Sequence, residues 1–234
     1  MKLFGLIGYP LSHSFSREYF LAKFKSENIA ATYKLFSISD VFQFPQLIEQ
    51  NLELAGLNVT IPYKETVIPF LDSLSKEARE IGAVNTIQFI NGKLIGNNTD
   101  IAGFEHTLEM LDFGNRKALV FGNGGASKAV QYVFKEKNIP FLIVNRTKSV
   151  GVLTYEELSK ELFKTHTILV NCTPVGTFPN ILECLPIPFS EISKNHIAID
   201  LVYNPETTQF LAKASEQGAK TVNGLPMLHR QAQK

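Results

Sequence analysis

The chain lacks several features that would mark it for particular classes of protein. Its cysteines, Cys172 and Cys184, are too few and too unpatterned for a disulfide framework or a zinc site. The charges nearly cancel, at a formal net charge of +1, and no basic stripe exists to replace counterions on nucleic acid. No apolar run reaches the length of a membrane span. Nucleic acid and membrane are therefore not expected as partners.

Two further absences concern metals and targeting. The histidines are scattered without ligand spacing, so we assign none of them to a metal. Residues 1–8 carry one charged side chain and are soon followed by Pro10 and Ser12, which indicates a first core strand rather than a signal peptide. These features favour a cytoplasmic protein, and 234 residues suit one large domain or two small ones.

The most informative segment present is residues 118–134, where a short apolar run breaks into glycines and resumes with helical spacing. A strand, a glycine turn and a helix N-terminus present backbone N–H groups to an anion, the arrangement that binds a dinucleotide pyrophosphate. The third small position is Ser127 rather than Gly or Ala, so a glycine-rich turn in an ordinary α/β protein is the alternative. The predicted cofactor contacts are Gly122, Asn123, Gly124, Gly125, Ala126 and Ser127.

The next apolar run, residues 141–144, ends about 20 residues beyond the first glycine, the usual distance to the position that reads the adenosine ribose. An NAD site places Asp or Glu there, whereas this chain has Arg146, with Lys148 nearby. Because a guanidinium forks onto a 2′-phosphate and stacks on adenine, the sequence predicts NADP as the cofactor. A solvated charge after a strand is the alternative interpretation of Arg146.

The residues before this unit alternate between strand and helix patterns. Strands are predicted over residues 2–8, 32–38 and 57–60, and helices over residues 15–27 and 65–81. Residues 86–90 and 93–95 are predicted to form a hairpin, because the Asn91-Gly92 pair between them suits a tight two-residue turn. The alternation implies a second, mostly parallel sheet.

The second half follows a similar pattern. A helix predicted over residues 101–111 connects the two parts. Beyond Asn145, only residues 155–163 have a helical pattern before a strand at 167–170, so one strand–helix unit is expected to be reduced to a loop. The fold class is therefore α/β, with a mostly parallel N-terminal α/β domain and a Rossmann-like second domain.

Several peptides along the chain occur together in one family. The N-terminal ones are residues 8–16 (GYPLSHSFS), 58–64 (NVTIPYK), 82–86 (GAVNT) and 98–103 (NTDIAG). With the glycine loop, residues 145–147 (NRT), 171–176 (NCTPVG), 200–203 (DLVY) and 223–232 (NGLPMLHRQA), the chain resembles the shikimate dehydrogenases. That resemblance implies a reversible, NADPH-dependent reduction of 3-dehydroshikimate to shikimate in chorismate and aromatic amino-acid biosynthesis, carried out by a monomer or a homodimer.

The resemblance also implies a division of the chain into two domains. Residues 1–101 would bind the substrate, with residues 225–234 packing back on them as a returning C-terminal helix. Residues 102–224 would form the NADP-binding Rossmann-like domain.

Lys64 and Asp100 match the catalytic positions of the family. Lys64 follows Pro62 at an expected helix start, where the positive end of the helix dipole disfavours an ammonium and so favours its use in proton transfer. A solvated lysine is the alternative for Lys64, and helix capping is the alternative for Asp100. Both residues lie at the ends of elements, where α/β enzymes keep their chemistry.

By the same resemblance, the hydroxyls of Ser14 and Ser16 hold the substrate carboxylate, although helix capping is again an alternative. The implied substrate site is completed by Thr60, Asn85, Asp100, Tyr203 and Gln231. The implied cofactor site extends beyond the glycine loop to Asn145, Arg146, Thr147, Thr173, Val202 and Gly224.

Three features depart from the family pattern. Arg17 stands where the family usually has Pro, and Thr177 stands where it usually has Met. Gln231 lies close to the C-terminal end and is expected to sit on a segment that frays.

Two other functions stay open at this point. One is a quinate/shikimate dehydrogenase that uses NAD or NADP, against which Arg146 and the paired serines argue. The other is a module that senses NADP or a metabolite without turnover. The presence of both Lys64 and Asp100 argues against such a module, because a pure binder needs no pair of groups for proton transfer.

Overall fold

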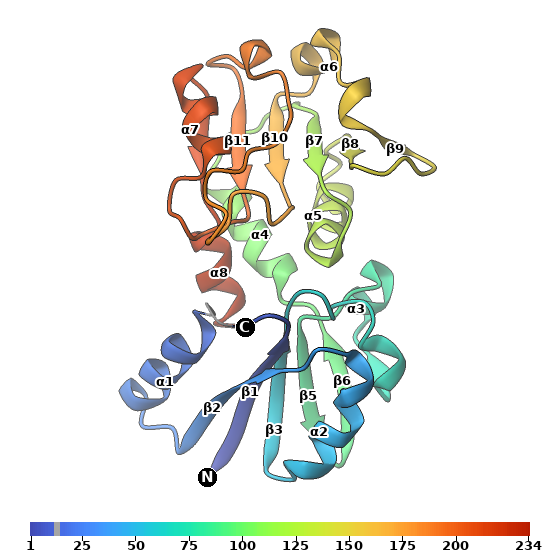
Figure 1. Cartoon of the computed structure of the whole chain (residues 1–234), viewed down its shortest axis with the longest axis vertical. Helices are drawn as coiled ribbons and strands as arrows, with labels where there is room; N and C mark the ends of the chain where they lie inside the picture. Colours follow the sequence, from blue (N-terminus) through green and yellow to red (C-terminus); the bar gives the residue numbers. More distant parts are fainter. Residues whose placement is uncertain (12–14) are drawn as a thin grey trace. The chain divides into compact units, whose positions relative to one another are not determined.

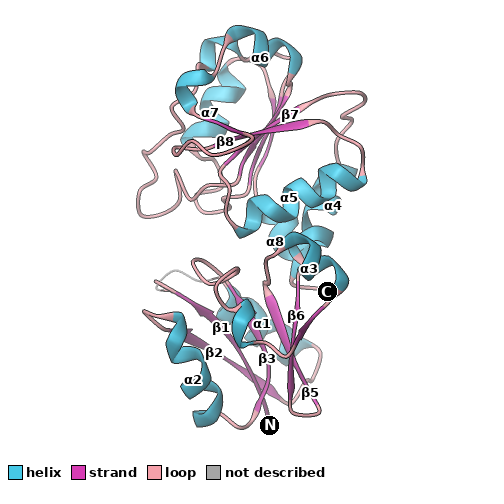
Figure 2. Ribbon diagram, turned by 90° about the vertical axis from the view of Figure 1, so that its right-hand side faces the viewer, coloured by secondary structure: helices cyan, strands magenta, loops and turns pink. Residues whose placement is uncertain are grey.

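The computed structural model describes residues 1–11 and 15–234. The chain divides into two compact units, Met1–Asn98 (unit 1) and Thr99–Lys234 (unit 2), whose elements are drawn in Figures 1 and 2. Each unit is a layered α/β structure, which confirms the predicted fold class. Among the residues that the structure describes, none of the helices is both long enough and apolar enough to cross a membrane.

Unit 1 is built on a mixed sheet with the strand order β2-β1-β3-β5-β6-β4. β1 is parallel to β2 and β3, whereas β5 is antiparallel to β3 and β6. Buried Leu3 and Leu57 pack with Phe44 on one side of the sheet, and Leu6 packs with Phe24 of α1 in a separate cluster. The elements are β1 (Lys2–Gly8), α1 (Ser16–Ser26), β2 (Ala31–Ser37), η1 (Val41–Gln43), α2 (Phe44–Gln50), β3 (Leu54–Val59), η2 (Ile68–Phe70), β4 (Ser73–Leu74), α3 (Lys76–Ile81), β5 (Thr86–Ile90) and β6 (Lys93–Asn97).

The predicted hairpin forms between β5 and β6, and its turn has the backbone that the sequence indicates. Asn91 and Gly92 have φ angles of 52° and 75°. Positive φ at both central residues is what a type I′ turn requires, and Asn-Gly adopts it with the least strain. The local sequence therefore determined this turn.

The helix predicted over residues 65–81 is wrong for most of its length. Pro69 biases the residue before it away from helix. The backbone N–H of Asp72 then donates to the Leu94 carbonyl (3.0 Å), and the Asp72 carboxylate accepts from the Leu94 N–H (2.7 Å). These bonds to β6 hold the chain extended as β4, so a helix begins only after Ser75, the N-cap residue of α3.

Unit 2 is built on a parallel sheet with the order β12-β11-β10-β7-β8-β9. From β7, the chain adds strands first on one side and then on the other, so the topological switch point lies between β7 and β10. Figure 2 shows α4 and α5 on one side of this sheet and α6 and α7 on the other. The elements are α4 (Asp100–Glu109), β7 (Ala118–Phe121), α5 (Gly125–Glu136), β8 (Phe141–Val144), β9 (Val152–Leu153), η3 (Tyr155–Glu157), α6 (Lys160–Thr165), β10 (Ile168–Asn171), η4 (Phe189–Glu191), β11 (Ile197–Asp200), α7 (Gln209–Glu216), β12 (Lys220–Val222) and α8 (Leu225–Gln231).

Two details of unit 2 concern the predicted helices. The chain from β8 to β9 runs through residues 145–151 without a helix, but the short strand β9 pairs with β8, so the predicted reduction of a strand–helix unit to a loop is right for the helix and wrong for the strand. The helix predicted over residues 155–163 is instead η3 followed by α6. Ser159 explains the break, because its side chain accepts from the Leu162 N–H (3.4 Å) and starts a new helix.

The C-terminal helix α8 belongs to unit 2 by its contacts. It packs on α4, and buried Met227 joins the core that contains Phe104. Gly103 shows how closely the two helices approach: a Cβ built on it would lie 2.7 Å from the Met227 carbonyl oxygen. The structural boundary therefore falls after Asn98, and residues 225–234 group with unit 2.

Candidate active site

Three residues predicted to act on the substrate lie at one edge of the sheet of unit 1. β3 ends at this edge and β5, which is antiparallel to it, begins there. Thr60 follows β3, and its backbone N–H donates to the Ile7 carbonyl (2.9 Å). Asn85 precedes β5, is 3% exposed, and accepts at its backbone oxygen from the Val59 N–H (2.7 Å). The edge therefore holds the backbone of both residues rigidly.

Lys64 lies at the same edge, in a turn after β3 rather than at the start of an α-helix. The helix-dipole argument made from the sequence is therefore wrong for this lysine. Its backbone oxygen accepts from the Val84 N–H (2.7 Å). The preceding residue, buried Tyr63, donates its hydroxyl to the Ile38 carbonyl (2.6 Å). These two bonds fix the backbone from which the Lys64 side chain extends.

Ser16 is the first residue of α1 and hydrogen-bonds to the hydroxyl of Tyr33 on β2. Tyr33 is buried, stacks on Phe20 with ring centroids 4.7 Å apart, and donates its hydroxyl to Asn58 Oδ1 (2.7 Å). Burial raises the pKa of Tyr33, so it remains a neutral hydroxyl. Ser14, like Ser12 and His13, lies outside the described residues.

In unit 2 the glycine loop follows β7, at the switch point of the parallel sheet. Gly122 has a φ of +99°, and a Cβ there would lie 2.9 Å from Thr173 Cγ2. Gly124 is the N-cap residue of α5, and a Cβ built on it would point into open space. The start of α5 is therefore available to an anion, as the sequence pattern predicts.

Ser127, which occupies the third small position of the glycine loop, is fully buried under this loop. Its hydroxyl donates to the Gly122 carbonyl (2.7 Å), and it accepts from Gln131 Nε2 (3.0 Å). Gln131 Nε2 also lies 3.3 Å from Asn123 Oδ1. A small residue is needed here for close packing of helix on strand, and serine meets that need while tying the loop to α5.

Arg146 follows β8 at the same edge of the sheet and lines a cavity of about 410 Å³ together with Tyr155, Glu156 and Pro186. Burial raises the pKa of Tyr155 to about 12, and the nearby Arg146 guanidinium acts in the opposite direction. Lys148 forms an ion pair with Glu157, whose carboxylate also accepts from the Thr154 N–H. Arg146, rather than Lys148, is therefore the cation that faces this cavity.

The remaining predicted residues of unit 2 lie after its strands or on its helices. Thr173 follows β10, and Val202 and Tyr203 follow β11. Gly224 precedes α8, and a Cβ there would collide with the carbonyl oxygen of Leu201. Asp100 is the first residue of α4 and is 4% exposed. Glycine is thus required at position 224 by a close backbone approach.

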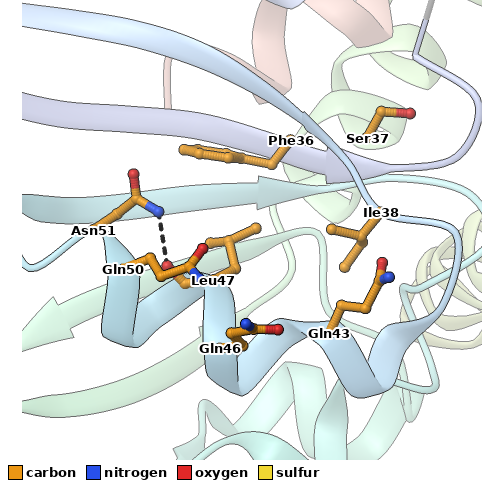
Figure 3. Close-up of a pocket in the computed structure, with 8 residues that line it drawn as sticks. All are labelled: Phe36, Ser37, Ile38, Gln43, Gln46, Leu47, Gln50 and Asn51. Carbon is orange, nitrogen blue, oxygen red and sulfur yellow. Dashed lines mark hydrogen bonds between the residues drawn. The ribbon is translucent and has the colours of Figure 1, made fainter.

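A second cavity, of about 300 Å³, lies in unit 1 between the end of β2 and α2 (Figure 3). It is lined by residues 36–38, by Gln43 at the end of η1, and by Gln46 and Gln50 of α2. None of the predicted site residues lines it, so the cavity beside Arg146 is the one that relates to the predicted chemistry.

Comparison with known proteins identifies the family. A family model described as the shikimate dehydrogenase substrate binding domain matches residues 6–87. The shikimate dehydrogenase (NADP(+)) of Methanococcus maripaludis is 39% identical, over 97% of this chain and 87% of its own length. The chain belongs to the shikimate dehydrogenase family.

The folds of solved shikimate dehydrogenases match that of this chain over nearly its whole length. The crystal structure of shikimate dehydrogenase 1 from Peptoclostridium difficile matches with a TM-score of 0.86 and 39% identity, over 99% of this chain and 89% of that one. The enzyme of Thermus thermophilus, in complex with NADP(H) and shikimate, matches with a TM-score of 0.87 and 32% identity, over 99% of this chain and 90% of that one.

The structure shows how the chain accommodates two departures from the family pattern, Arg17 and Thr177. Arg17 is the second residue of α1, so the helix starts without the usual proline. Thr177 donates its hydroxyl to the Asn204 carbonyl (3.3 Å), a bond that methionine would not make. Its loop is therefore tied to the segment after β11.

Four polar residues that hold the predicted site residues of this family member received no role from the sequence. Tyr33 and Asn58 support Ser16, while Asn171 and Asp200 support the loops after β10 and β11. A usable signal was present: a tyrosine inside a predicted strand needs a partner for its hydroxyl, and polar residues ended two apolar runs.

Proposed function

We propose that the protein is an NADP-dependent oxidoreductase, a shikimate dehydrogenase that reversibly reduces 3-dehydroshikimate to shikimate in the cytoplasm. In this role it serves the biosynthesis of chorismate and aromatic amino acids. The observation that carries the proposal is the sequence identity of 39% to a shikimate dehydrogenase (NADP(+)), over 97% of this chain.

The chemistry of the carboxyl edge of the sheet in unit 2 fits NADP(H). The glycine loop and the start of α5 offer backbone N–H groups for the pyrophosphate. The guanidinium of Arg146, which lines the cavity of about 410 Å³, suits a bidentate contact with a 2′-phosphate. No carboxylate occupies this position to bind the ribose hydroxyls of NAD. Asn145, Thr147, Thr173, Val202 and Gly224 complete the proposed cofactor site.

For the substrate, we assign the ring hydroxyls to Thr60, Asn85, Asp100, Tyr203 and Gln231, and the carboxylate to Ser14 and Ser16. Short hydroxyls and amides suit a small polyol acid, because a polar site rejects analogues that leave its groups unpaired. We assign substrate binding to residues 1–101 together with residues 225–234, although the latter group with unit 2 by their contacts, and NADP binding to residues 102–224.

NADPH supplies the hydride that adds to the C3 carbonyl carbon of the substrate. The Lys64 ammonium stabilises the negative charge that develops on the carbonyl oxygen and gives that oxygen a proton. We assign Asp100 a share with Lys64 in the transfer of this proton. In the oxidation direction the Lys64 amine takes the proton from the C3 hydroxyl, as reversibility requires.

Initial rates with shikimate and with quinate, each against NADP⁺ and NAD⁺, test this proposal. We expect the highest kcat/KM for shikimate with NADP⁺. Equal or greater efficiency with quinate or NAD⁺ would favour a quinate/shikimate dehydrogenase. Binding of NADP⁺ without turnover of either acid would instead identify a sensing module.

A further inference from the structure

A buried cluster of polar side chains lies beneath the carboxyl edge of the sheet in unit 2. Asn171 ends β10 and Asp200 ends β11, and the two residues are directly paired in the parallel register. Both are 0% exposed, and Thr208, at the N-cap of α7, is 1% exposed. Polar groups this deeply buried are kept only when their hydrogen bonds are made.

Asn171 connects this cluster to the loop after β10. Its Oδ1 accepts from both the backbone N–H (2.9 Å) and the hydroxyl (2.7 Å) of Thr173. Its Nδ2 donates to Asp200 Oδ1 (2.9 Å). The Thr173 hydroxyl in turn accepts from the Val175 N–H (3.2 Å), so one amide side chain determines the path of this loop.

Asp200 connects the cluster to the segment after β11. The same Oδ1 also accepts from the Val202 N–H (3.0 Å), and Oδ2 accepts from the Thr208 hydroxyl (2.6 Å). The Val202 carbonyl accepts from the Gly224 N–H (3.0 Å). Val202 is therefore held on both sides, and its position depends on the carboxylate.

A cluster of this kind contributes little net stability to a fold, because burying a charged group costs free energy. Neutral donors from Asn171, Val202 and Thr208 hold the carboxylate, and burial raises the pKa of Asp200 to about 6. Apolar residues of similar volume often stabilise a core as well or better than a buried charge. What a buried hydrogen-bonded carboxylate adds is a fixed geometry for the groups that donate to it.

We propose that Asp200 is a positioning residue that holds, through Asn171 and the Val202 N–H, the two loops that receive the nicotinamide half of NADP(H). The inference rests on the proposed function. A dinucleotide lies across the switch point, and Arg146 places the adenosine half on the β8 side. The other half then lies over the ends of β10 and β11, where Thr173 and Val202 stand.

The experiment compares variants that break different bonds of the cluster. Asp200→Ala removes the acceptor for all three donors. Asn171→Leu removes both bonds from Thr173 and the Nδ2 donor to Asp200, but leaves the bonds that Val202 and Thr208 donate to the carboxylate. Thr208→Val is the matched control, because it breaks a bond of similar burial that anchors α7 and leaves the Oδ1 bonds intact. Asp200→Asn keeps one oxygen and serves as the conservative rescue.

Turnover is measured with NADP⁺, and binding is measured with NADP⁺ and with adenosine 2′,5′-bisphosphate, a probe of the adenosine half. We expect Asp200→Ala and Asn171→Leu to lower kcat by about 10- to 100-fold, the scale of a small misplacement of reacting groups. Their Kd for NADP⁺ should rise about fivefold or more, with that for the bisphosphate within twofold. Thr208→Val should lower the Tm with kcat within threefold, and Asp200→Asn should recover at least part of the kcat.

Each outcome decides the inference. If Asp200→Ala does not fold, Asn171→Leu against Thr208→Val still separates positioning from stability. If Asn171→Leu keeps wild-type kcat, or if Thr208→Val loses as much as Asn171→Leu, the positioning role is wrong. A wild-type protein without turnover of shikimate would remove the proposed function and this inference together, whereas active wild type with indifferent variants removes this inference alone.

Discussion

The Thr99 hydroxyl hydrogen-bonds to Gln231 Oε1 at 3.3 Å, which links the residue before α4 to the last residue of α8. The link lies next to Asp100, the first residue of α4. The packing of α8 on α4 therefore holds Gln231 near the N-terminal end of α4.

From this link we predict that Gln231→Ala raises KM for shikimate by about 5- to 10-fold, the effect of losing one hydrogen bond of about 1–1.5 kcal/mol. The Kd for NADP⁺ should stay within twofold, because the glycine loop and Arg146 lie at the strand ends rather than on α8. Gln233→Ala, at an exposed position, is the matched control. Equal weakening of both ligands would place α8 in the cofactor site.

The second prediction concerns proton transfer. Lys64→Ala should lower kcat by roughly 10²-fold or more, the scale of a general acid or base, while binding of shikimate weakens less. Lys93→Ala, at an exposed position of the hairpin, controls for loss of a charge. Steady-state kinetics and isothermal titration with shikimate check both effects. Turnover near the wild-type rate would show that Lys64 does not handle the proton.

The third prediction concerns cofactor choice. Arg146→Ala should raise KM for NADP⁺ by about 10-fold or more and barely change KM for NAD⁺, because a charge-assisted contact of about 1.5–3 kcal/mol is lost. Lys148→Ala should have a smaller effect, since Lys148 is paired with Glu157. Equal effects of Arg146→Ala on the two cofactors would show that this arginine does not read the 2′-phosphate.

The fourth prediction concerns pH. The pKa of Asp200 is raised by burial from 3.8 to about 6, so folding favours its protonated form. The associated stability is fully present below about pH 4 and is lost as pH rises through 6, a change of about 3 kcal/mol. Burial lowers the pKa of His166 and of His196, which gives the opposite slope in an overlapping window.

Asp200→Asn separates these contributions, because both histidines remain in the variant. Urea unfolding of the two proteins from pH 4 to pH 7.5 gives the difference in free energy of unfolding at each pH. The stability of wild type relative to the variant should fall as pH rises. A difference that does not change with pH would mean that Asp200 does not titrate in this range.

The sequence by itself determined the features that depend on neighbouring residues. Asn91-Gly92 is enough to specify its turn, because few dipeptides tolerate positive φ at both positions. The glycine loop and Arg146 are recognisable because a parallel strand delivers its next residues to the carboxyl edge of the sheet.

Only the tertiary structure decided the features that depend on distant segments. Residues 65–81 follow a helical pattern, but Asp72 pairs with Leu94 on β6, and that pairing makes β4. Asn171 and Asp200 lie far apart in the sequence and meet only because β10 and β11 pair in one register. Local propensity carries no information on such pairings, since their free energy comes from hydrogen bonds and burial that exist only in the assembled sheet.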